Sequence, residues 1–134
     1  MATIFTRIIN GELPSHRVAE DEHHFAFLDI NPVAPGHTLV VPKQEIDYIF
    51  DMESDAYAAL MQFCHQLAPS VQQAVPCKRV GIAVIGLEVP HVHVHLVPMQ
   101  QVDDLNFAKP KMNMASDELA RIAEKIRQHY AQHA

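Results

Sequence analysis

The sequence predicts an α+β fold, in which two long helices and a short N-terminal helix accompany an antiparallel, five-stranded meander sheet. Short runs of β-branched and aromatic residues are separated by tight turns, which favours antiparallel pairing. One apolar pattern of helical period interrupts these runs, and a second follows them. The 134 residues, 49% of them hydrophobic, suit one domain with its own core. We expect a single domain over 1–134, with a core over 1–110 and a C-terminal helical segment over 111–134.

Helical periodicity and capping residues place the helices. In the first, isoleucines recur at roughly helical spacing and Gly11 follows as a stop signal. The other two begin at Ser54 and Ser116, which we expect to act as N-caps. The expected helices cover residues 3–10, 53–75 and 116–129.

The strands are predicted from β-branched and aromatic runs bounded by turn residues. The segment HTLVV, ended by Pro42, is the strongest of them. The turn 86–90 separates the last two. The expected strands cover residues 16–21, 23–30, 37–41, 79–85 and 91–98.

Charge and composition exclude several classes of protein. The net charge of −6 lacks the basic footprint of nucleic-acid binders, so we expect no nucleic-acid partner. No apolar stretch reaches the length of a membrane span, and the start MATIFTRII lacks a secretory signal, so we expect a cytoplasmic protein without a membrane partner. Cys64 and Cys77 are not spaced as a metal-binding pair and are expected to be reduced thiols.

The segment HVHVH at 91–95 carries the clearest chemical signal. Because side chains alternate along a strand, His91, His93 and His95 share one face, while the apolar residues among them fill the other. Three interpretations follow from the residues alone. The face could be solvated, it could bind a metal ion, or it could catalyse nucleophilic and acid–base chemistry, since imidazole titrates near neutral pH. Alternate residues on one regular strand converge poorly on a single ion, which disfavours the metal site.

This segment, followed by LVP, resembles the histidine triad motif His-x-His-x-His with apolar x. Three other segments resemble the same family in the same order: IFTRIINGELPS at 4–15, FAFLDI at 25–30 and APGHTLVVPK at 34–43. The chain is therefore similar to the histidine triad (HIT) family, closest to its nucleotide-binding, Hint-like branch.

The resemblance implies a hydrolase or transferase that cleaves purine nucleoside phosphoramidates or related mononucleotide conjugates. In that family the middle histidine, here His93, attacks the α-phosphorus and is transiently nucleotidylated. His91 and His95 would orient that ring and assist proton transfer, and His37 would approach from the neighbouring strand. No cofactor or metal is implied for this step.

The resemblance also implies a nucleotide-binding pocket. Asp29 would accept hydrogen bonds from the ribose hydroxyls. Ile8, Leu13, Phe27 and Ile30 would line the pocket for the base, although each of them also suits an ordinary core.

The sequence departs from the family before the triad. Leu87 replaces a usual glutamine, Glu88 replaces a hydroxyl residue, and Ala83 replaces an asparagine. We expect Glu88 to lie near the site, where it would repel a phosphate or hydrogen-bond a histidine or the leaving amine. These changes motivate a second hypothesis, a nucleotide-binding module with little catalysis, beside the third, a metal-binding protein that uses the triad.

Three further expectations complete the prediction. Some relatives bind structural zinc through N-terminal cysteines, but Thr3 and Thr6 stand in that region here, so no such zinc is expected. Relatives are commonly homodimers, and helix 53–75 has enough apolar surface to take part. The cationic residues of the tail are expected to be solvated rather than to touch a ligand: Lys109, Lys111 and Arg121.

Overall fold

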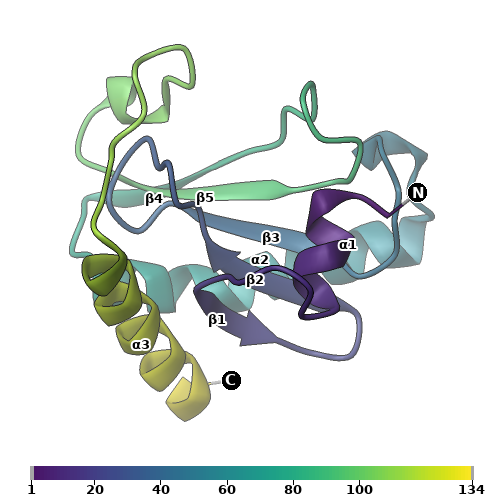
Figure 1. The fold of residues 1–134 in the computed structure, drawn as a ribbon, viewed down its shortest axis with the longest axis horizontal. Helices are drawn as coiled ribbons and strands as arrows, with labels where there is room; N and C mark the ends of the chain where they lie inside the picture. The colour runs from purple at the N-terminus through teal and green to yellow at the C-terminus, as the bar shows by residue number, and fades with distance from the viewer. Residues whose placement is uncertain (1, 134) are drawn as a thin grey trace.

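The computed structural model describes residues 2–133, and it confirms the predicted α+β class (Figure 1). Five strands, three α-helices and two short 3₁₀ helices follow one another in the order α1 (Ile4–Ile9), β1 (Arg17–Glu20), β2 (His24–Leu28), β3 (Thr38–Pro42), η1 (Ile49–Asp51), α2 (Ser54–Ala74), β4 (Arg79–Ala83), β5 (Val94–Met99), η2 (Val102–Leu105) and α3 (Ser116–His133).

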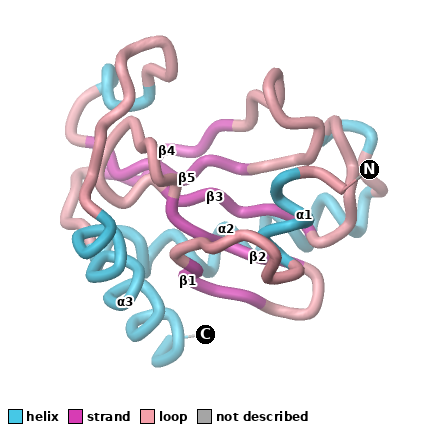
Figure 2. The backbone as a smooth tube through the Cα atoms, in the orientation of Figure 1, coloured by secondary structure: helices cyan, strands magenta, loops and turns pink. Residues whose placement is uncertain are grey.

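The strands form one antiparallel sheet in the order β1-β2-β3-β5-β4, drawn in magenta in Figure 2. A strict meander is therefore wrong for the last two strands. α2 carries the chain from β3 past the position of β5 to the edge, and β5 then returns between β3 and β4. Because β3 and β4 both pair antiparallel to β5, they run in the same direction, and joining such strands requires a long crossover, which α2 supplies.

The main core lies between the sheet and the two long helices. In Figure 1, α2 lies behind the sheet and α3 packs beside it. α2 buries Leu60, Phe63, Leu67 and Val71, which repeat at helical spacing, and α3 adds Leu119, Ala123 and Ile126. Residues from β2, β3 and β5 meet them from the sheet: Ala26, Leu28, Val40, Val94 and Leu96.

The opposite face of the sheet carries a second, smaller cluster beneath α1, the helix in front of the sheet in Figure 1. Strand alternation sends Phe27 and Leu39 to this face. The register places Phe27 opposite Leu39, and Leu39 opposite His95. A row of side chains therefore crosses three strands and ends at the last histidine of the triad.

Several predicted ends are shifted: β2 ends at Leu28 rather than at 30, β4 at Ala83 rather than at 85, and α3 at His133 rather than at 129. Two predicted starts are also wrong. β5 begins at Val94 rather than at His91, because the Val92 N–H donates to the Ile46 carbonyl of a loop and not to a strand. The N-cap of α2 is Glu53 rather than Ser54, which is the first helical residue. Within residues 2–133 none of the helices combines the length and the hydropathy needed to cross a bilayer.

Candidate active site

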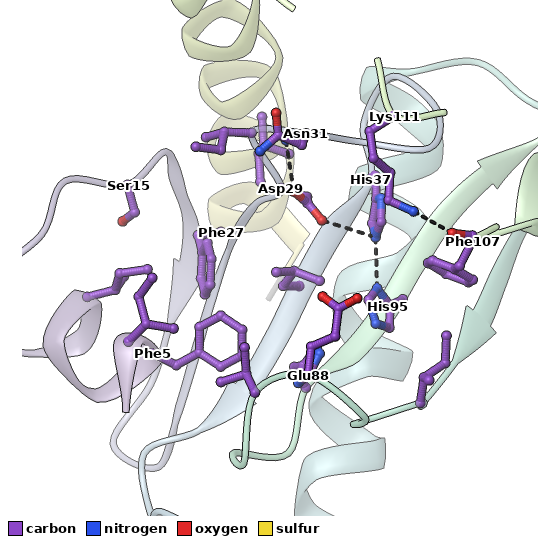
Figure 3. A pocket seen from close by; sticks show the side chains of 18 of the residues that line it. Phe5, Ser15, Phe27, Asp29, Asn31, His37, Glu88, His95, Phe107 and Lys111 are labelled. Atoms are coloured by element: carbon purple, nitrogen blue, oxygen red, sulfur yellow. Dashed lines mark hydrogen bonds and ion pairs between the residues drawn. The ribbon is translucent and has the colours of Figure 1, made fainter. Parts of the chain in front are cut away.

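A cavity of about 500 Å³ opens on the α1 face of the sheet, the size of site that holds small ligands (Figure 3). Its residues come from α1, β2, β3, the loop before the triad, β5 and the segment after η2. The side chains that line it include Phe5, Ile8, Phe27, Asp29, Ile30, His37, Glu88, His93, His95, Phe107 and Lys111.

His93 lines this cavity and is oriented by the backbone. Its Nδ1 lies 2.8 Å from the carbonyl oxygen of His91. A carbonyl only accepts, so Nδ1 carries the proton and donates it, and Nε2 keeps its lone pair. Phe5 packs edge-on against the ring, with centroids 4.9 Å apart, which limits its rotation. His93 is 8% exposed and lines the pocket. Because Nδ1 is engaged, Nε2 is the ring nitrogen that can act as a nucleophile toward a ligand there.

His91 lies behind His93 and does not line the cavity, although it was predicted to share its face. The ring is fully buried, and both nitrogens are engaged. Nε2 donates to the carbonyl of Pro42 at 2.8 Å, so the neutral ring accepts at Nδ1 from the Thr3 hydroxyl, 2.7 Å away. Its role in this structure is to present its backbone carbonyl to His93.

His37 and His95 form a second hydrogen-bonded pair. The Val33 N–H donates to His37 Nδ1 at 3.1 Å, which leaves the proton of a neutral His37 on Nε2. That Nε2–H donates to His95 Nδ1 at 2.9 Å, so a neutral His95 carries its own proton on Nε2. Each group in this series therefore donates to the next, from the buried Val33 N–H through His37 to His95 at the pocket. The outcome is one acceptor nitrogen, on His93, beside one donor nitrogen, on His95, whose ring centroids are 5.1 Å apart.

Burial favours the neutral form of His37, His95 and His91. Loss of solvation, reinforced by neighbouring imidazoles and Lys111, lowers the pKa of His37 to about 3 and that of His95 to about 4. Burial also lowers the pKa of His91, against the opposing effects of the Pro42 carbonyl and Glu45. Protonation of His95 at Nδ1 would also place a proton against the Nε2–H of His37. His95 is thus neutral and presents its Nε2–H to the cavity.

Asp29 ends β2 at the rim of the cavity, where the resemblance places the ribose. One carboxylate oxygen accepts from the Asn31 N–H at 2.9 Å, which fixes the side chain. The other lies 3.8 Å from His37 Nε2. Burial raises the pKa of this carboxyl group, partly offset by the Asn31 N–H and Lys111. Figure 3 shows Asp29 between the α1 side of the pocket and the histidine pair.

The apolar end of the cavity lies between α1 and β2. Three of the four residues predicted for the base line it: Ile8, Phe27 and Ile30. Leu13 does not; it follows the turn after α1 and is only half-buried. Phe5 also lines the cavity and was not predicted from the sequence. Its position three residues before Ile8 puts both side chains on one face of α1, and that spacing could have identified it.

The segment after η2 closes the other end. Phe107 packs edge-on against His95 at 4.6 Å and against His37 at 5.7 Å between ring centroids. Lys111 donates to the Phe107 carbonyl at 2.6 Å, and its Nζ lies 5.7 Å from the Phe107 ring. Lys111 is exposed, as expected, but it also lines the cavity, whereas Lys109 pairs with Asp104 outside it.

The loop before the triad supplies the remaining wall. Gly86 has φ of +71°, a conformation that favours glycine, and it turns the chain so that Glu88 lines the cavity. In Figure 3 the Glu88 carboxylate extends between Asp29 and His95. Leu87 points largely to solvent, being 89% exposed. Ala83, directly opposite His95 in the β4–β5 ladder, offers no polar group.

Metal binding finds no support in this arrangement. Among residues 2–133, no group of three or more His, Cys, Asp or Glu side chains is arranged to hold an ion. Four of the six ring nitrogens of the triad are already bonded to carbonyls, a hydroxyl or another imidazole. Nε2 of His93 and Nε2 of His95 are the two that remain, which is fewer protein ligands than a zinc site uses. The cluster of histidines is consistent with a hydrogen-bonded catalytic group.

Comparison with known proteins agrees with this geometry. Residues 10–102 match the HIT domain. A HIT-like protein of Borreliella burgdorferi is 32% identical over 131 residues, covering 92% of this chain and 94% of its own. The adenosine 5′-monophosphoramidase of Saccharomyces cerevisiae is 29% identical over 127 residues, covering 93% and 80%.

A solved structure shares the same fold. The Zn-bound histidine triad family protein of Mycobacterium smegmatis superposes with a TM-score of 0.81 at 27% identity, covering 98% of this chain and 95% of its own. The histidine motif, its hydrogen-bonded setting and the domain match lead to the same conclusion: this chain belongs to the HIT family.

Proposed function

We propose that the protein is a nucleotidyl hydrolase or transferase that cleaves purine nucleoside phosphoramidates, or related mononucleotide conjugates, through a nucleotide covalently attached to His93. The observation that carries this proposal is the hydrogen bond from His93 Nδ1 to the His91 carbonyl, which holds the Nε2 lone pair ready for attack. The similarity to a yeast adenosine 5′-monophosphoramidase supports the substrate class.

The reaction would proceed in two displacements. In the first, a bond forms between His93 Nε2 and the α-phosphorus while the bond from phosphorus to the leaving nitrogen breaks, and that nitrogen takes a proton from water at the open mouth of the pocket. In the second, water attacks the same phosphorus, its proton passes to solvent, and the nucleoside monophosphate is released with free His93. Dividing one difficult substitution in this way lowers each barrier.

The other groups would stabilise charge and position the nucleotide. The Nε2–H of neutral His95 would donate to a phosphoryl oxygen as charge develops there. Asp29 would accept from the ribose hydroxyls, and Ile8, Phe27 and Ile30 would contact the base. This assignment replaces the proton transfer first expected from His95 with hydrogen-bond donation.

Trapping of the intermediate tests the proposal. Wild-type protein quenched with acid during turnover of a radiolabelled adenosine phosphoramidate should carry label on His93, located by peptide mapping. His93→Ala should lose both label and turnover while keeping its circular dichroism spectrum and unfolding midpoint. Full turnover by His93→Ala would exclude the mechanism. Tight binding of AMP without any turnover by the wild type would instead favour a nucleotide-binding module.

We also propose a homodimer formed along β4 and α2. β4 is an edge of the sheet, and Ile82 on it is 47% exposed. Tyr57 on α2 is 38% exposed, which adds apolar surface to the same proposal. Sedimentation velocity should give twice the mass of the chain, and Ile82→Lys should shift the species toward the monomer. A wild-type monomer at micromolar concentration would remove the proposal.

A further inference from the structure

The cavity carries fixed charges that the triad does not explain. Of the described residues that line it, Lys111 alone has a fixed positive charge, while Asp29 and Glu88 bear carboxylates. No ion pair within residues 2–133 involves Lys111 or Glu88. Both charges therefore remain available to a ligand.

Lys111 lies on the side of the histidine pair. Its bond to the Phe107 carbonyl and the packing of Phe107 on His95 hold the ammonium group next to that ring. Its positive charge also disfavours protonation of His37 and His95 and favours ionisation of Asp29. An α-phosphate that accepts from the Nε2–H of His95 would lie within the influence of this charge.

Glu88 lies across the pocket on the loop before the triad. It extends toward the space between Asp29 and His95, and its charge opposes ionisation of Asp29 (Figure 3). An attack from His93 on phosphorus expels the leaving group on the side opposite to the incoming nitrogen. Asp29 and the apolar end of the cavity would hold the nucleoside. The leaving group would then lie at the mouth of the cavity, where Glu88 is exposed.

We propose that Glu88 and Lys111 divide the substrate by charge: Lys111 offsets the α-phosphate, and Glu88 selects leaving groups that are positively charged amines over those that are anionic. This inference rests on the proposed function and names its substrate class more narrowly. A carboxylate at the mouth attracts an ammonium and accepts its N–H, whereas it repels a carboxylate or a further phosphate. Conjugates with anionic leaving groups, such as dinucleoside polyphosphates, are therefore poor substrates.

Lys111 lies outside the segment that matches the HIT domain, whereas Glu88 lies inside it. The family match ends at residue 102, whereas Phe107 and Lys111 follow η2. Glu88, in turn, stands where the family usually has a hydroxyl residue. The reacting imidazoles lie inside the family match, and one of the two charges beside them lies outside it.

Three adenosine phosphoramidates of equal length test the inference. Their amines are 1,3-diaminopropane, butylamine and β-alanine, which give the leaving group a positive, neutral or negative end. For the wild type we expect kcat/KM to fall in that order, with about tenfold between the first and the last, equivalent to about 1.4 kcal/mol. Glu88→Gln should bring all three within about twofold of one another.

Lysine variants separate the two roles. Lys111→Met should lower kcat/KM for all three substrates by a similar factor, because the phosphate is common to them. Lys109→Met is the matched control, since Lys109 pairs with Asp104 outside the cavity, and it should leave all three rates unchanged. A charge order that survives in Glu88→Gln would overturn the role of Glu88, and an unchanged Lys111→Met would overturn that of Lys111.

A failure of the proposed function would be recognisable by itself. If the wild type turns over none of the three conjugates, the hydrolase assignment fails, and calorimetric dissociation constants for the same conjugates then decide the selection by charge. The diaminopropane conjugate should bind most tightly, and Glu88→Gln should remove its advantage. Equal affinities in the wild type would refute the inference.

Discussion

Thr3→Val removes one oxygen atom at the base of the catalytic group, and we expect it to affect both stability and turnover. The Thr3 hydroxyl lies 2.7 Å from His91 Nδ1 and accepts from the Thr6 N–H at 3.1 Å. The first contact satisfies a buried ring nitrogen, and the second caps α1. Valine has nearly the same shape but makes neither bond.

The surroundings of His91 prevent a simple rescue. Its Nε2 must remain protonated to donate to the Pro42 carbonyl, so the Nδ1 lone pair would be left without a donor in a fully buried ring. Protonation of Nδ1 would place an unpaired charge in the same position. Leaving a buried acceptor unsatisfied costs about 1–3 kcal/mol, and losing an N-cap costs about 0.5–2 kcal/mol. Because one hydroxyl serves both bonds, we expect about 2–3 kcal/mol less free energy of unfolding in total.

Urea denaturation followed by far-ultraviolet circular dichroism measures this loss, since the chain has no tryptophan for fluorescence. Thr3→Ser, which keeps the oxygen, is the matched control and should unfold within about 0.5 kcal/mol of the wild type. In a phosphoramidase assay Thr3→Val should lower kcat by about tenfold, equivalent to about 1.4 kcal/mol, with a smaller change in KM, because a displaced His91 carbonyl misaligns His93. Stability and kcat equal to those of Thr3→Ser would refute this account of His91.

Three further outcomes are expected. The pKa of His37 and of His95 is 6.5 in the unfolded chain, whereas it is about 3 for His37 and about 4 for His95 in the folded protein. As the pH falls through 6.5, these side chains therefore bind protons only in the unfolded state. The free energy of unfolding should therefore be level above about pH 7.5 and fall by up to about 2.7 kcal/mol per pH unit toward pH 4.5, and a level profile in urea titrations across that window would contradict it. Asp29→Asn should raise KM about tenfold, equivalent to about 1.4 kcal/mol, and change kcat less, because the ribose loses a charged acceptor; an unchanged KM would exclude that contact. Burial raises the pKa of Cys64 to about 12, so iodoacetamide should label Cys77 in the native protein and Cys64 only after unfolding, as peptide mass mapping would show.

Local patterns were sufficient to predict most of the fold. The strands and long helices rest on periodicity, which the structure confirms for their type and approximate position. The order of the last two strands was beyond such patterns, because it depends on where α2 delivers the chain. The start of β5 was also beyond them, since Val92 bonds with Ile46 rather than with a strand.

The candidate site was predictable where one segment determines it. Alternation placed His93 and His95 on a common face, and both line the cavity. The separate position of His91 arises from Thr3, which is 88 residues away in the chain. Lys111 reaches the pocket through an irregular segment after η2, which no period describes, so its composition alone suggested a solvated tail.

The direction of the hydrogen bonds would let a chain of net charge −6 accommodate the anionic nucleotide of the proposed function. In the pair that faces the pocket, a backbone N–H holds the first imidazole in the tautomer that donates to the second, and the second directs its own N–H to the ligand. Neutral donors arranged in this way need no positive charge to be buried before the ligand arrives, which avoids the desolvation cost of an imidazolium. Fixed charge is then needed only at the rim, where Lys111 and Glu88 remain exposed to solvent. The buried histidines would therefore favour transfer of any nucleotidyl group. The exposed charges of Lys111 and Glu88 would decide which conjugate is the preferred substrate.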